Sequence, residues 1–362
     1  MRKLLSFFTL ALMCVATISA ATNIKGTQVA TVDRMYQFVK SKNANFDPEI
    51  AKYFYSVGAK YGIRGDIAIC QSCVETGYFK YPSPTAVTPE DHNYCGLGVT
   101  TTGKKGCIFD TVEEGVTAQI QHLYAYCCKD AIPSGETLID PRFNYVTRGC
   151  ATTWEALGGK WATGTTYGTQ ILSVYNTMMS YSVVDPSIEA SSTSLTMSAD
   201  YNGTSPTKSV TITGNYLLSD IVYNSNTSAF KVTTGSDWNK YEGGTLNISL
   251  DTSKAPGNYS GYIAVQSGSG SDIKRVEINI TATIKDPNDP LIAVEPTTIS
   301  LTGKQGEANP SANIIVTAMN LNTAITYSVS NSAFIVTPGS DWNTTTGGSL
   351  NVALDTSKEI GS

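Results

Sequence analysis

Two kinds of hydrophobic periodicity divide the chain near residue 185. Before that point, apolar residues recur every three or four positions, which is the period of an amphipathic α-helix. The segments with this pattern are 29–39, 47–61, 66–76, 111–127 and 167–181. From residue 187 onward, apolar and polar residues alternate in short runs, as in strands with one buried face. The pattern therefore predicts a mostly helical region followed by an all-β region.

Several predicted helices carry their own start and stop signals. Asp47 followed by Pro48 is a favourable helix start, because Asp caps the first turn and proline suits the first helical position. The helix at 66–76 is apolar on nearly every face, so we expect it to be buried and to end at Gly77. Thr111 followed by Glu114 is a capping-box pattern that starts a long helix.

The β region repeats itself with a period of 104 residues. Between residues 228–254 and 332–358, 19 of 27 positions are identical. A unit of about 100 residues with short strands has the size of an immunoglobulin-like sandwich. The predicted parts are a first repeat at 187–285, a linker at 286–290 and a truncated second repeat at 291–362.

The second repeat is shorter than the first. After the shared segment, the first repeat continues with two further predicted strands, at 259–266 and 274–284, whereas the second stops at Ser362 before either. A sandwich without these strands leaves an apolar face and a sheet edge uncovered. We therefore expect residues 291–362 to be unstable in isolation and the gene product to continue.

Residues 1–21 have the features of a signal peptide. Arg2 and Lys3 precede an apolar run at 4–15 that is too short to span a bilayer, and residues 19–21 offer a cleavage site between small residues. No later segment is apolar and long enough to cross a membrane. We expect an exported protein that is periplasmic, attached to the cell surface or secreted, with no transmembrane segment after the signal is removed.

Composition limits the partners that the protein is expected to bind and the part of the chain that could carry catalytic or metal-binding residues. Charged residues make up 15% of the chain and the formal net charge is −5, with no long basic run, so nucleic acid is not an expected partner. All eight cysteines lie at or before Cys150, and both histidines, His92 and His122, lie in the same part. Thiol or imidazole chemistry is therefore excluded from the β region.

Export would place seven cysteines in an oxidising compartment, so at least one of them has no partner within the chain. Cys95 and Cys107 bracket a short Gly- and Thr-rich segment and are the candidate disulfide; the other pairings stay open. A zinc site is an alternative, because Cys70-x-x-Cys73 precedes His92-x-x-Cys95. Since Cys70 and Cys73 fall within a buried helix, we expect no metal site and no cofactor.

Glu75 is the main candidate for chemistry. It lies at the C-terminal end of the apolar helix and is followed by Tyr78, Phe79 and Tyr81. Burial and the negative end of the helix dipole both raise the pKa of a carboxyl group, which suits a general acid. The structural alternative is an ordinary solvated residue near a helix end.

Several motifs follow one another along the helical region. Gln71-Ser-Cys-Val-Glu-Thr-Gly77 precedes His92-Asn-Tyr-Cys-Gly-Leu-Gly98. Further motifs lie at 113–123, 140–145, 154–162 and 167–168. In this order they resemble the glucosaminidase family of peptidoglycan hydrolases, over residues 27–182. The resemblance implies a lysozyme-like α fold, cleavage after N-acetylglucosamine in cell-wall glycan, and Glu75 as the catalytic acid.

The second carboxylate of such an enzyme is not evident. Some family members carry it in the lobe after the Asn-aromatic-x-Gly turn, but residues 96–108 contain no acidic residue. The candidates nearby are Glu90, Asp91, Asp110 and Glu113, with Glu114 assigned to helix capping. An alternative needs no second carboxylate, because the substrate's own N-acetyl group can attack the anomeric carbon.

Aromatic residues are the candidates for sugar contacts, since rings pack on pyranose faces. The predicted substrate-binding residues are Gln71, Asn93, Tyr94, Trp161 and Tyr167. Each has a structural alternative: Gln71 could orient Glu75 or pack, Asn93 could set the turn, and the aromatic residues could belong to the core. His122 is expected to be structural.

The sequence thus predicts a multidomain protein, with a mostly α, lysozyme-like catalytic domain at 22–184 followed by all-β immunoglobulin-like sandwich repeats. Its predicted function is that of an exported endo-β-N-acetylglucosaminidase acting on peptidoglycan or a related N-acetylglucosamine-containing glycan. The alternatives are a non-catalytic surface glycan-binding or adhesion protein, and a muramidase or lytic transglycosylase. The repeats are interpreted as spacers or wall-attachment modules, in which Trp238 and Trp342 either fill the core or stack on sugars.

Overall fold

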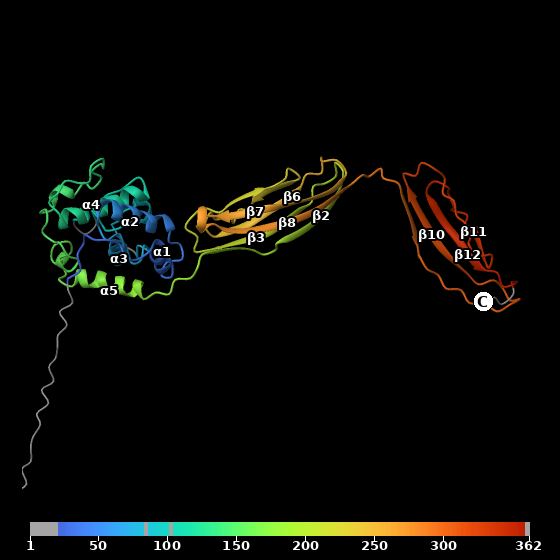
Figure 1. Cartoon of the computed structure of the whole chain (residues 1–362), viewed down its shortest axis with the longest axis horizontal. Helices are drawn as coiled ribbons and strands as arrows, with labels where there is room; N and C mark the ends of the chain where they lie inside the picture. The colour runs from blue at the N-terminus through green and yellow to red at the C-terminus, as the bar shows by residue number, and fades with distance from the viewer. Residues whose placement is uncertain (1–20, 83–85, 101–103, 359–362) are drawn as a thin grey trace, which may run out of the picture.

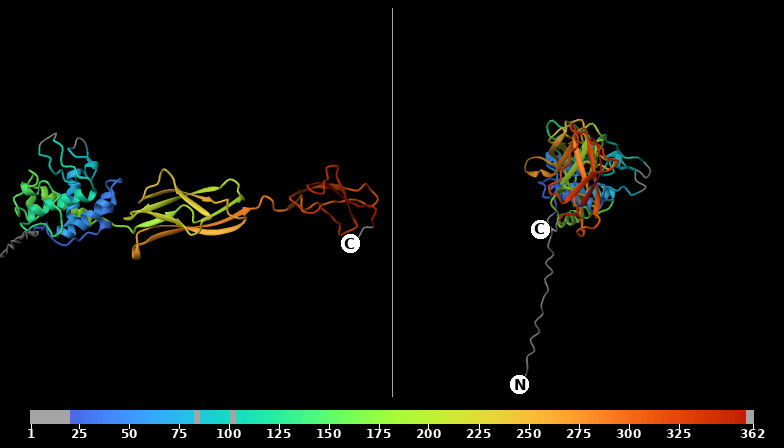
Figure 2. Two further views of the ribbon diagram at one scale, coloured as in Figure 1. Left: turned by 90° about the horizontal axis from the view of Figure 1, so that it is seen from above. Right: turned by 90° about the vertical axis from the view of Figure 1, so that its right-hand side faces the viewer.

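The computed structural model describes residues 21–82, 86–100 and 104–358. The predicted signal peptide therefore lies outside the described residues, apart from its last residue. A helical domain, a β-sandwich and a further β-sheet follow one another in a row (Figure 1), and Figure 2 shows the same parts from above and from the end. The described part thus has the multidomain, helical-then-β class that the sequence predicts.

Five α-helices make up the described helical domain. They are α1 (Val32–Lys40), α2 (Pro48–Tyr61), α3 (Gly65–Thr76), α4 (Val112–Cys127) and α5 (Tyr167–Met179). Short 3-10 turns lie at η1 (Pro89–Asp91), η2 (Phe143–Tyr145), η3 (Glu155–Leu157) and, in the β region, η4 (Gly270–Asp272). Each predicted helix is present, but α1 begins later than its apolar pattern. Thr31 caps it by accepting from the backbone nitrogen of Arg34, which leaves Val29 outside the helix and exposed.

The other predicted helix ends are confirmed. The Asp47 side chain accepts a hydrogen bond from the backbone nitrogen of Glu49 at the start of α2. Thr111 accepts from the backbone nitrogen of Glu114 at the start of α4. Gly77 ends α3 in the left-handed conformation, with φ 59°, which glycine adopts at little cost.

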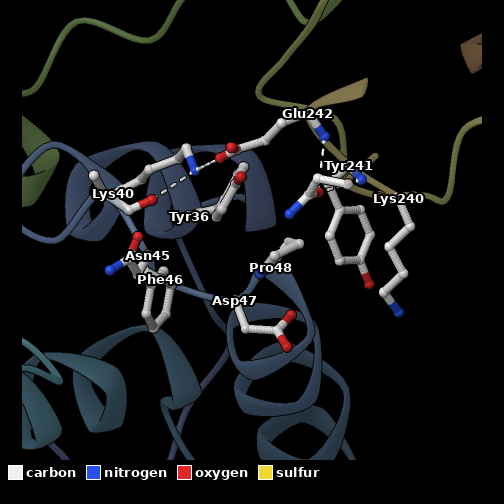
Figure 3. Close-up of a pocket in the computed structure, with 11 residues that line it drawn as sticks. Tyr36, Lys40, Asn45, Phe46, Asp47, Pro48, Lys240, Tyr241 and Glu242 are labelled. Carbon is white, nitrogen blue, oxygen red and sulfur yellow. Dashed lines mark hydrogen bonds and ion pairs between the residues drawn. The ribbon is translucent and has the colours of Figure 1, made fainter. Parts of the chain in front are cut away.

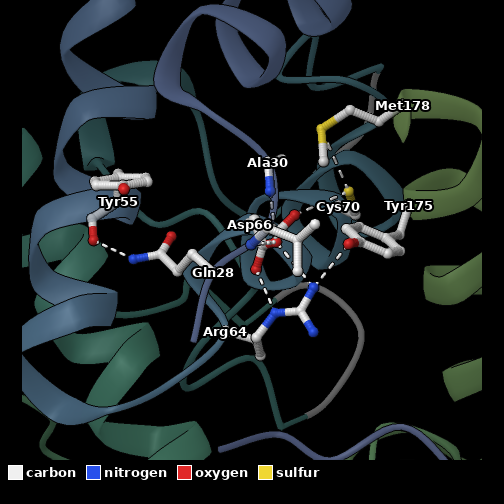
Figure 4. Close-up of polar contacts among 9 residues, drawn as sticks. Gln28, Ala30, Tyr55, Arg64, Asp66, Cys70, Tyr175 and Met178 are labelled. Atoms are coloured by element: carbon white, nitrogen blue, oxygen red, sulfur yellow. Dashed lines mark hydrogen bonds and ion pairs between the residues drawn. The ribbon is translucent and has the colours of Figure 1, made fainter. Parts of the chain in front are cut away.

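A buried ion pair fixes the start of α3 against two other segments (Figure 4). The Asp66 carboxylate accepts from Arg64 Nε at 2.8 Å and from Arg64 Nη2 at 2.9 Å. It also accepts from the backbone nitrogens of Val29 at 2.8 Å and Ala30 at 3.1 Å. Arg64 Nη2 reaches Tyr175 of α5, with 2.7 Å to the hydroxyl oxygen. Asp66 thereby ties the N-terminal segment, α3 and α5 together.

The first repeat is a sandwich of two four-stranded sheets. One has the order β1 (Ser187–Ala190), β3 (Thr207–Asn215), β6 (Gly243–Leu250), β5 (Phe230–Thr234). The other has the order β2 (Ser194–Asp200), β8 (Lys274–Lys285), β7 (Gly257–Ser267), β4 (Val222–Ser225). β2 and β8 run parallel and the other pairs antiparallel. Alternate residues of β6, namely Leu246, Ile248 and Leu250, are fully buried, as the predicted alternation requires.

The second repeat forms a single sheet within the described residues. Its order is β11 (Phe334–Pro338), β12 (Gly347–Leu354), β10 (Ser311–Met319), β9 (Leu291–Glu295). In the first repeat, β2 pairs with β8 and β4 with β7, and the counterpart of β7 would begin only at residue 361. The counterparts of β2 and β4 accordingly form no strand in the part described. Phe334 is 42% exposed, whereas the equivalent Phe230 is 2% exposed.

Candidate functional site

Glu75 is the second-last residue of α3, the most buried helix of the domain. Ten of the 12 residues of α3 are buried, and Glu75 is exposed to solvent. The left-handed Gly77 turns the chain away directly after it. The helix therefore holds a carboxyl group at the edge of the core and leaves it accessible.

Two aromatic side chains donate hydrogen bonds to this carboxyl group. The hydroxyl of Tyr167, the first residue of α5, donates to Glu75 Oε1. Trp161, in the loop before α5, provides a second hydrogen bond. Tyr167 is 5% exposed and Trp161 is half-buried. Two of the three predicted sugar-contact aromatics thus lie at Glu75, where the tyrosine hydroxyl and the indole bind the carboxyl group itself.

A buried chain of polar side chains lies behind Tyr167. Gln71 Nε2 donates to the Tyr167 hydroxyl at 2.9 Å, and Gln71 Oε1 accepts from Gln119 Nε2 at 3.0 Å. Gln119 Oε1 accepts from Ser72 Oγ at 2.9 Å. Gln71, Ser72 and Gln119 are fully buried. Because each amide oxygen is occupied by a donor, the Gln71 amide points its NH₂ group at Tyr167, and the tyrosine proton is left for Glu75.

Trp161 is positioned by a second pair of residues. Its ring contacts the ring of His122 edge-on, with centroids 4.9 Å apart. The Nδ1 atom of His122 lies 2.8 Å from Asp140 Oδ2, and Asp140 is buried. This contact supports the structural role expected for His122. Sequence reasoning missed Gln119 and Asp140, although both lie within motifs quoted for the family resemblance.

The surroundings raise the pKa of Glu75 above its usual value. Desolvation by the surrounding protein atoms is the largest cause, and the hydrogen bonds from Tyr167 and Trp161 oppose it. The side chain is exposed on one side, so solvent reaches it, while protein atoms crowd it on the others. No described carboxylate is among the groups that shift this pKa. The shift therefore comes from burial, and a neighbouring negative charge does not cause it.

The structure places two predicted substrate contacts away from solvent. Tyr94 is 2% exposed and packs against Phe54 and Phe79, with ring centroids 6.3 and 5.7 Å away. Its ring has no face open to a sugar, so this placement does not support the predicted stacking. Asn93 Nδ2 donates to the carbonyl oxygens of Leu97 and Cys107, each at 2.9 Å, and Asn93 Oδ1 accepts from the backbone nitrogen of Leu97 at 2.9 Å. Asn93 thus sets the turn.

Gln71 is likewise fully buried, so the structure favours its orienting role over a sugar contact. Among the candidates for a second carboxylate, Asp91 is buried, accepts from the backbone nitrogen of Thr88 at 2.9 Å and pairs with Lys105 at 3.0 Å. These hydrogen bonds outweigh the opposing effect of desolvation, so the pKa of Asp91 is lowered. The exposed candidates are Glu90, Asp110 and Glu113. A second carboxylate stays a prediction.

The seven cysteines in the described residues carry free thiols, including Cys95 and Cys107. These two lie in one small apolar cluster with Leu97 and Phe109, so a bridge between them stays a prediction that this structure does not contain. In the part of the chain described, no group of three or more His, Cys, Asp or Glu side chains could hold a metal ion. Nor does any described helix have the length and apolarity needed to cross a bilayer.

Comparison with known proteins finds a family and two proteins that are similar to the helical part of this chain. Residues 51–211, from α2 to β3, match the glucosaminidase family, described as mannosyl-glycoprotein endo-beta-N-acetylglucosaminidase. An uncharacterised protein of Borreliella burgdorferi is 36% identical over 137 residues, which cover 38% of this chain and 65% of that protein. A crystal structure of a protein of unknown function from Porphyromonas gingivalis is 16% identical, with 46% of this chain and 83% of that chain covered and a TM-score of 0.21. Over residues 51–211, this chain is therefore similar to the glucosaminidase family.

Proposed function

We propose that this chain is an exported endo-β-N-acetylglucosaminidase that cleaves peptidoglycan after N-acetylglucosamine, with Glu75 as general acid. The observation that carries the proposal is one accessible carboxyl group with a raised pKa, held by Tyr167 and Trp161 in a glucosaminidase-family domain. A raised pKa keeps Glu75 protonated to higher pH than a free glutamate, as proton donation requires.

In the first step, Glu75 gives its proton to the glycosidic oxygen. The bond between that oxygen and the anomeric carbon breaks, and the leaving sugar departs as an alcohol. The Glu75 carboxylate left behind accepts the hydrogen bonds of Tyr167 and Trp161. Because these donors favour the charged form, they stabilise Glu75 after the proton has left.

The substrate's N-acetyl group fits the role of nucleophile. Its carbonyl oxygen would bond to the anomeric carbon as the glycosidic bond breaks, forming a cyclic oxazolinium ion. A water molecule would then attack the same carbon, and Glu75 would take the proton of that water, which restores the acid. In support, the groups that bind Glu75 are a tyrosine hydroxyl and an indole, and neither is a carboxylate. A glycosyl ester trapped on any of five residues would contradict this step, namely Glu90, Asp91, Asp110, Glu113 or Glu114.

The β repeats would affect catalysis by keeping the catalytic domain close to its substrate. They extend away from the helical domain in a row (Figure 1), and in the described residues their interiors are apolar with few polar groups. We interpret them as spacers or wall-attachment modules that keep the catalytic domain near an insoluble substrate, which raises its local concentration.

The test is digestion of purified peptidoglycan with the full chain, followed by mass spectrometry of the reduced fragments. We expect fragments with new reducing-end N-acetylglucosamine. Glu75→Gln should lower the rate by about 10²–10⁴-fold, the usual contribution of a general acid. Glu189→Gln, which changes an exposed glutamate on β1, is the matched control and should keep the wild-type rate.

The products also discriminate the alternatives. Reducing-end muramic acid would indicate a muramidase, and an anhydro-sugar would indicate a lytic transglycosylase. No products from the wild-type chain, together with binding to peptidoglycan in a sedimentation assay, would indicate a surface glycan-binding protein. Any of these three results contradicts the proposed bond specificity.

A further inference from the structure

The two repeats share a loop that is built in the same way. In both, a Gly-Ser-Asp-Trp-Asn segment leads into the strand β6 or β12. Asn239 Oδ1 accepts from the backbone nitrogens two and three residues further on, at 2.8 and 3.0 Å. Asn343 Oδ1 does the same at 2.8 and 3.2 Å. The identical residues of this motif thus form a scaffold that presents the three residues after the asparagine.

The presented residues differ between the repeats. The first repeat has Lys240-Tyr241-Glu242, and the second has three threonines at 344–346. These three consecutive positions account for three of the eight differences within the 27 aligned residues. Tyr241 is 7% exposed, whereas the equivalent Thr345 is exposed. The loop has the same hydrogen bonds in both repeats, but its central residue is buried only in the first.

The tip of the first repeat contacts the helical domain (Figure 3). Glu242 forms an ion pair with Lys40, the last residue of α1. The Tyr241 hydroxyl donates to Glu49 Oε1, in the first turn of α2, at 3.2 Å. The same Glu49 oxygen lies 3.6 Å from Lys240 Nζ. All three tip residues therefore contact the corner between α1 and α2.

The loop at Tyr216 also differs between the repeats in its contact with the helical domain, and its backbone is strained. Tyr216 has a φ of 53°, in the left-handed region, and its ring packs edge-on against Tyr36 of α1, with centroids 6.3 Å apart. The equivalent Asn320 has a φ of 54°. Asparagine tolerates this conformation, whereas a bulky aromatic residue is an outlier there. The first repeat keeps the less favourable residue at the position that contacts the helical domain.

Further contacts complete the junction between the helical domain and the first repeat. Lys52 Nζ of α2 donates to the carbonyl oxygen of Leu218 at 3.2 Å. Leu218 itself packs against the core of the helical domain, and its counterpart in the second repeat is Asn322. The buried Gln37 of α1 binds the backbone of Val184 twice, at 2.8 and 2.9 Å, which fixes the connecting segment.

We propose that the first repeat carries a dedicated docking face for the helical domain of its own chain, and that the second repeat lacks it. The docking face consists of Tyr216, Leu218, Lys240, Tyr241 and Glu242. The docking face complements the α1–α2 corner in charge, because Glu242 pairs with Lys40 and Lys240 pairs with Glu49. It also adds apolar and aromatic contacts. The first repeat is thus part of the catalytic body and sets the direction in which the rest of the chain leaves it, and the second repeat cannot replace it.

The test transplants the sequence of the second repeat onto the first. In the full chain, Lys240→Thr, Tyr241→Thr and Glu242→Thr are combined, which the loop tolerates because the second repeat has these residues. We expect the melting temperature of the helical domain to fall by about 3–6 °C, as loss of a buried aromatic anchor predicts. Small-angle X-ray scattering should show a broader distribution of interatomic distances, because the helical domain and the first repeat move independently.

The matched control makes the same kind of exchange away from the junction. Lys231→Ile with Ser249→Ala also introduces residues of the second repeat, and should leave both the melting temperature and the scattering profile unchanged. A charge exchange, Lys40→Glu with Glu242→Lys, should recover part of what either change alone loses. If the threonine variant melts and scatters like the wild type, there is no dedicated docking face.

Discussion

The helical domain and the first sandwich differ in what they bury. Of 15 buried polar or charged side chains among the described residues, 12 lie in the helical domain. The sandwich core consists of Ile, Leu and Val with one Phe, one Met and one Ala. Burial of apolar side chains is the dominant favourable contribution in a core of this kind. The polar interior of the helical domain needs its own explanation: Asp66 ties the fold together, and other buried polar groups lead to Glu75.

Several buried polar groups of the helical domain form chains that lead to the surroundings of Glu75. Gln119 and Gln71 lead to Tyr167 and Glu75, and Asp140 leads through His122 to Trp161. A buried polar group is costly unless all its partners are present, so such chains fix one arrangement. The comparison teaches that, in this chain, the polar interior holds the site and the apolar interior holds the spacer.

The largest loss of stability is expected when a buried charged side chain of the helical domain is removed. Asp66→Ala would leave Arg64 and the backbone nitrogens of Val29 and Ala30 without their acceptor. Breaking a buried ion pair in this way costs about 3–5 kcal/mol. Amide hydrogen exchange, resolved by segment, should show this loss in α3 and α5 and no change in β6 to β8. Equal losses in both parts would mean that the two interiors are not independent.

The matching change in the apolar interior is Ile263→Ala in β7, a fully buried position. Removal of a buried isoleucine side chain costs about 2–5 kcal/mol through lost burial and the cavity left behind. Hydrogen exchange should report the loss in the sandwich, while the rate of peptidoglycan digestion stays at the wild-type value. A large loss of activity would show that the sandwich core takes part in the site.

Much of the fold was predictable because its signals are local. The Asp47-Pro48 start, the Gly77 stop and the capping residue Thr111 act within one turn of helix, so the sequence alone is enough. The strand pattern also reads directly, because every second residue faces the core. Glu75 became a candidate through its position at the end of an apolar helix, which is a local feature, together with the resemblance of residues 71–77 to a family motif, and its catalytic role stays a prediction.

The remaining parts of the site depend on contacts between distant segments. Tyr94 follows the predicted turn and looks available for a sugar, but Phe54 and Phe79 enclose it. Gln119 lies 48 positions from Gln71, and no local pattern connects them. One signal was present for Gln119, because a polar residue among the apolar residues of a buried helix needs a partner. A sequence signal for the docking face was also present, because the two repeats differ at three consecutive positions, 240–242, within an otherwise similar segment.

A smaller effect is expected where the polar chain is interrupted without removing a charge. Gln119→Leu leaves Gln71 and Ser72 with unmet hydrogen bonds, which costs about 1–3 kcal/mol of stability. With the Gln71 amide free to turn, Tyr167 is no longer constrained to donate to Glu75. We expect kcat to fall while KM stays near the wild-type value.

The control is Ile120→Val on the same helix, which lowers the stability by about 0.5–1.5 kcal/mol and leaves the hydrogen bonds of Gln119 and Gln71 in place. It should leave kcat unchanged at a temperature where both variants are folded. If Gln119→Leu and Ile120→Val lower kcat equally, then Gln119 serves stability only and the polar interior does not position the acid.

The last prediction concerns the hydrogen bond from Tyr167 to Glu75, where the expected effect is a shift in pH dependence. This hydrogen bond favours the charged carboxylate and lowers its pKa against the larger effect of desolvation. Tyr167→Phe removes it, so the pKa of Glu75 should rise further. Because the protonated form is the proton donor, activity falls as pH rises through this pKa. The alkaline limb of kcat/KM should therefore move to higher pH, although the maximal rate is lower. A limb that stays in place would mean that another group governs it.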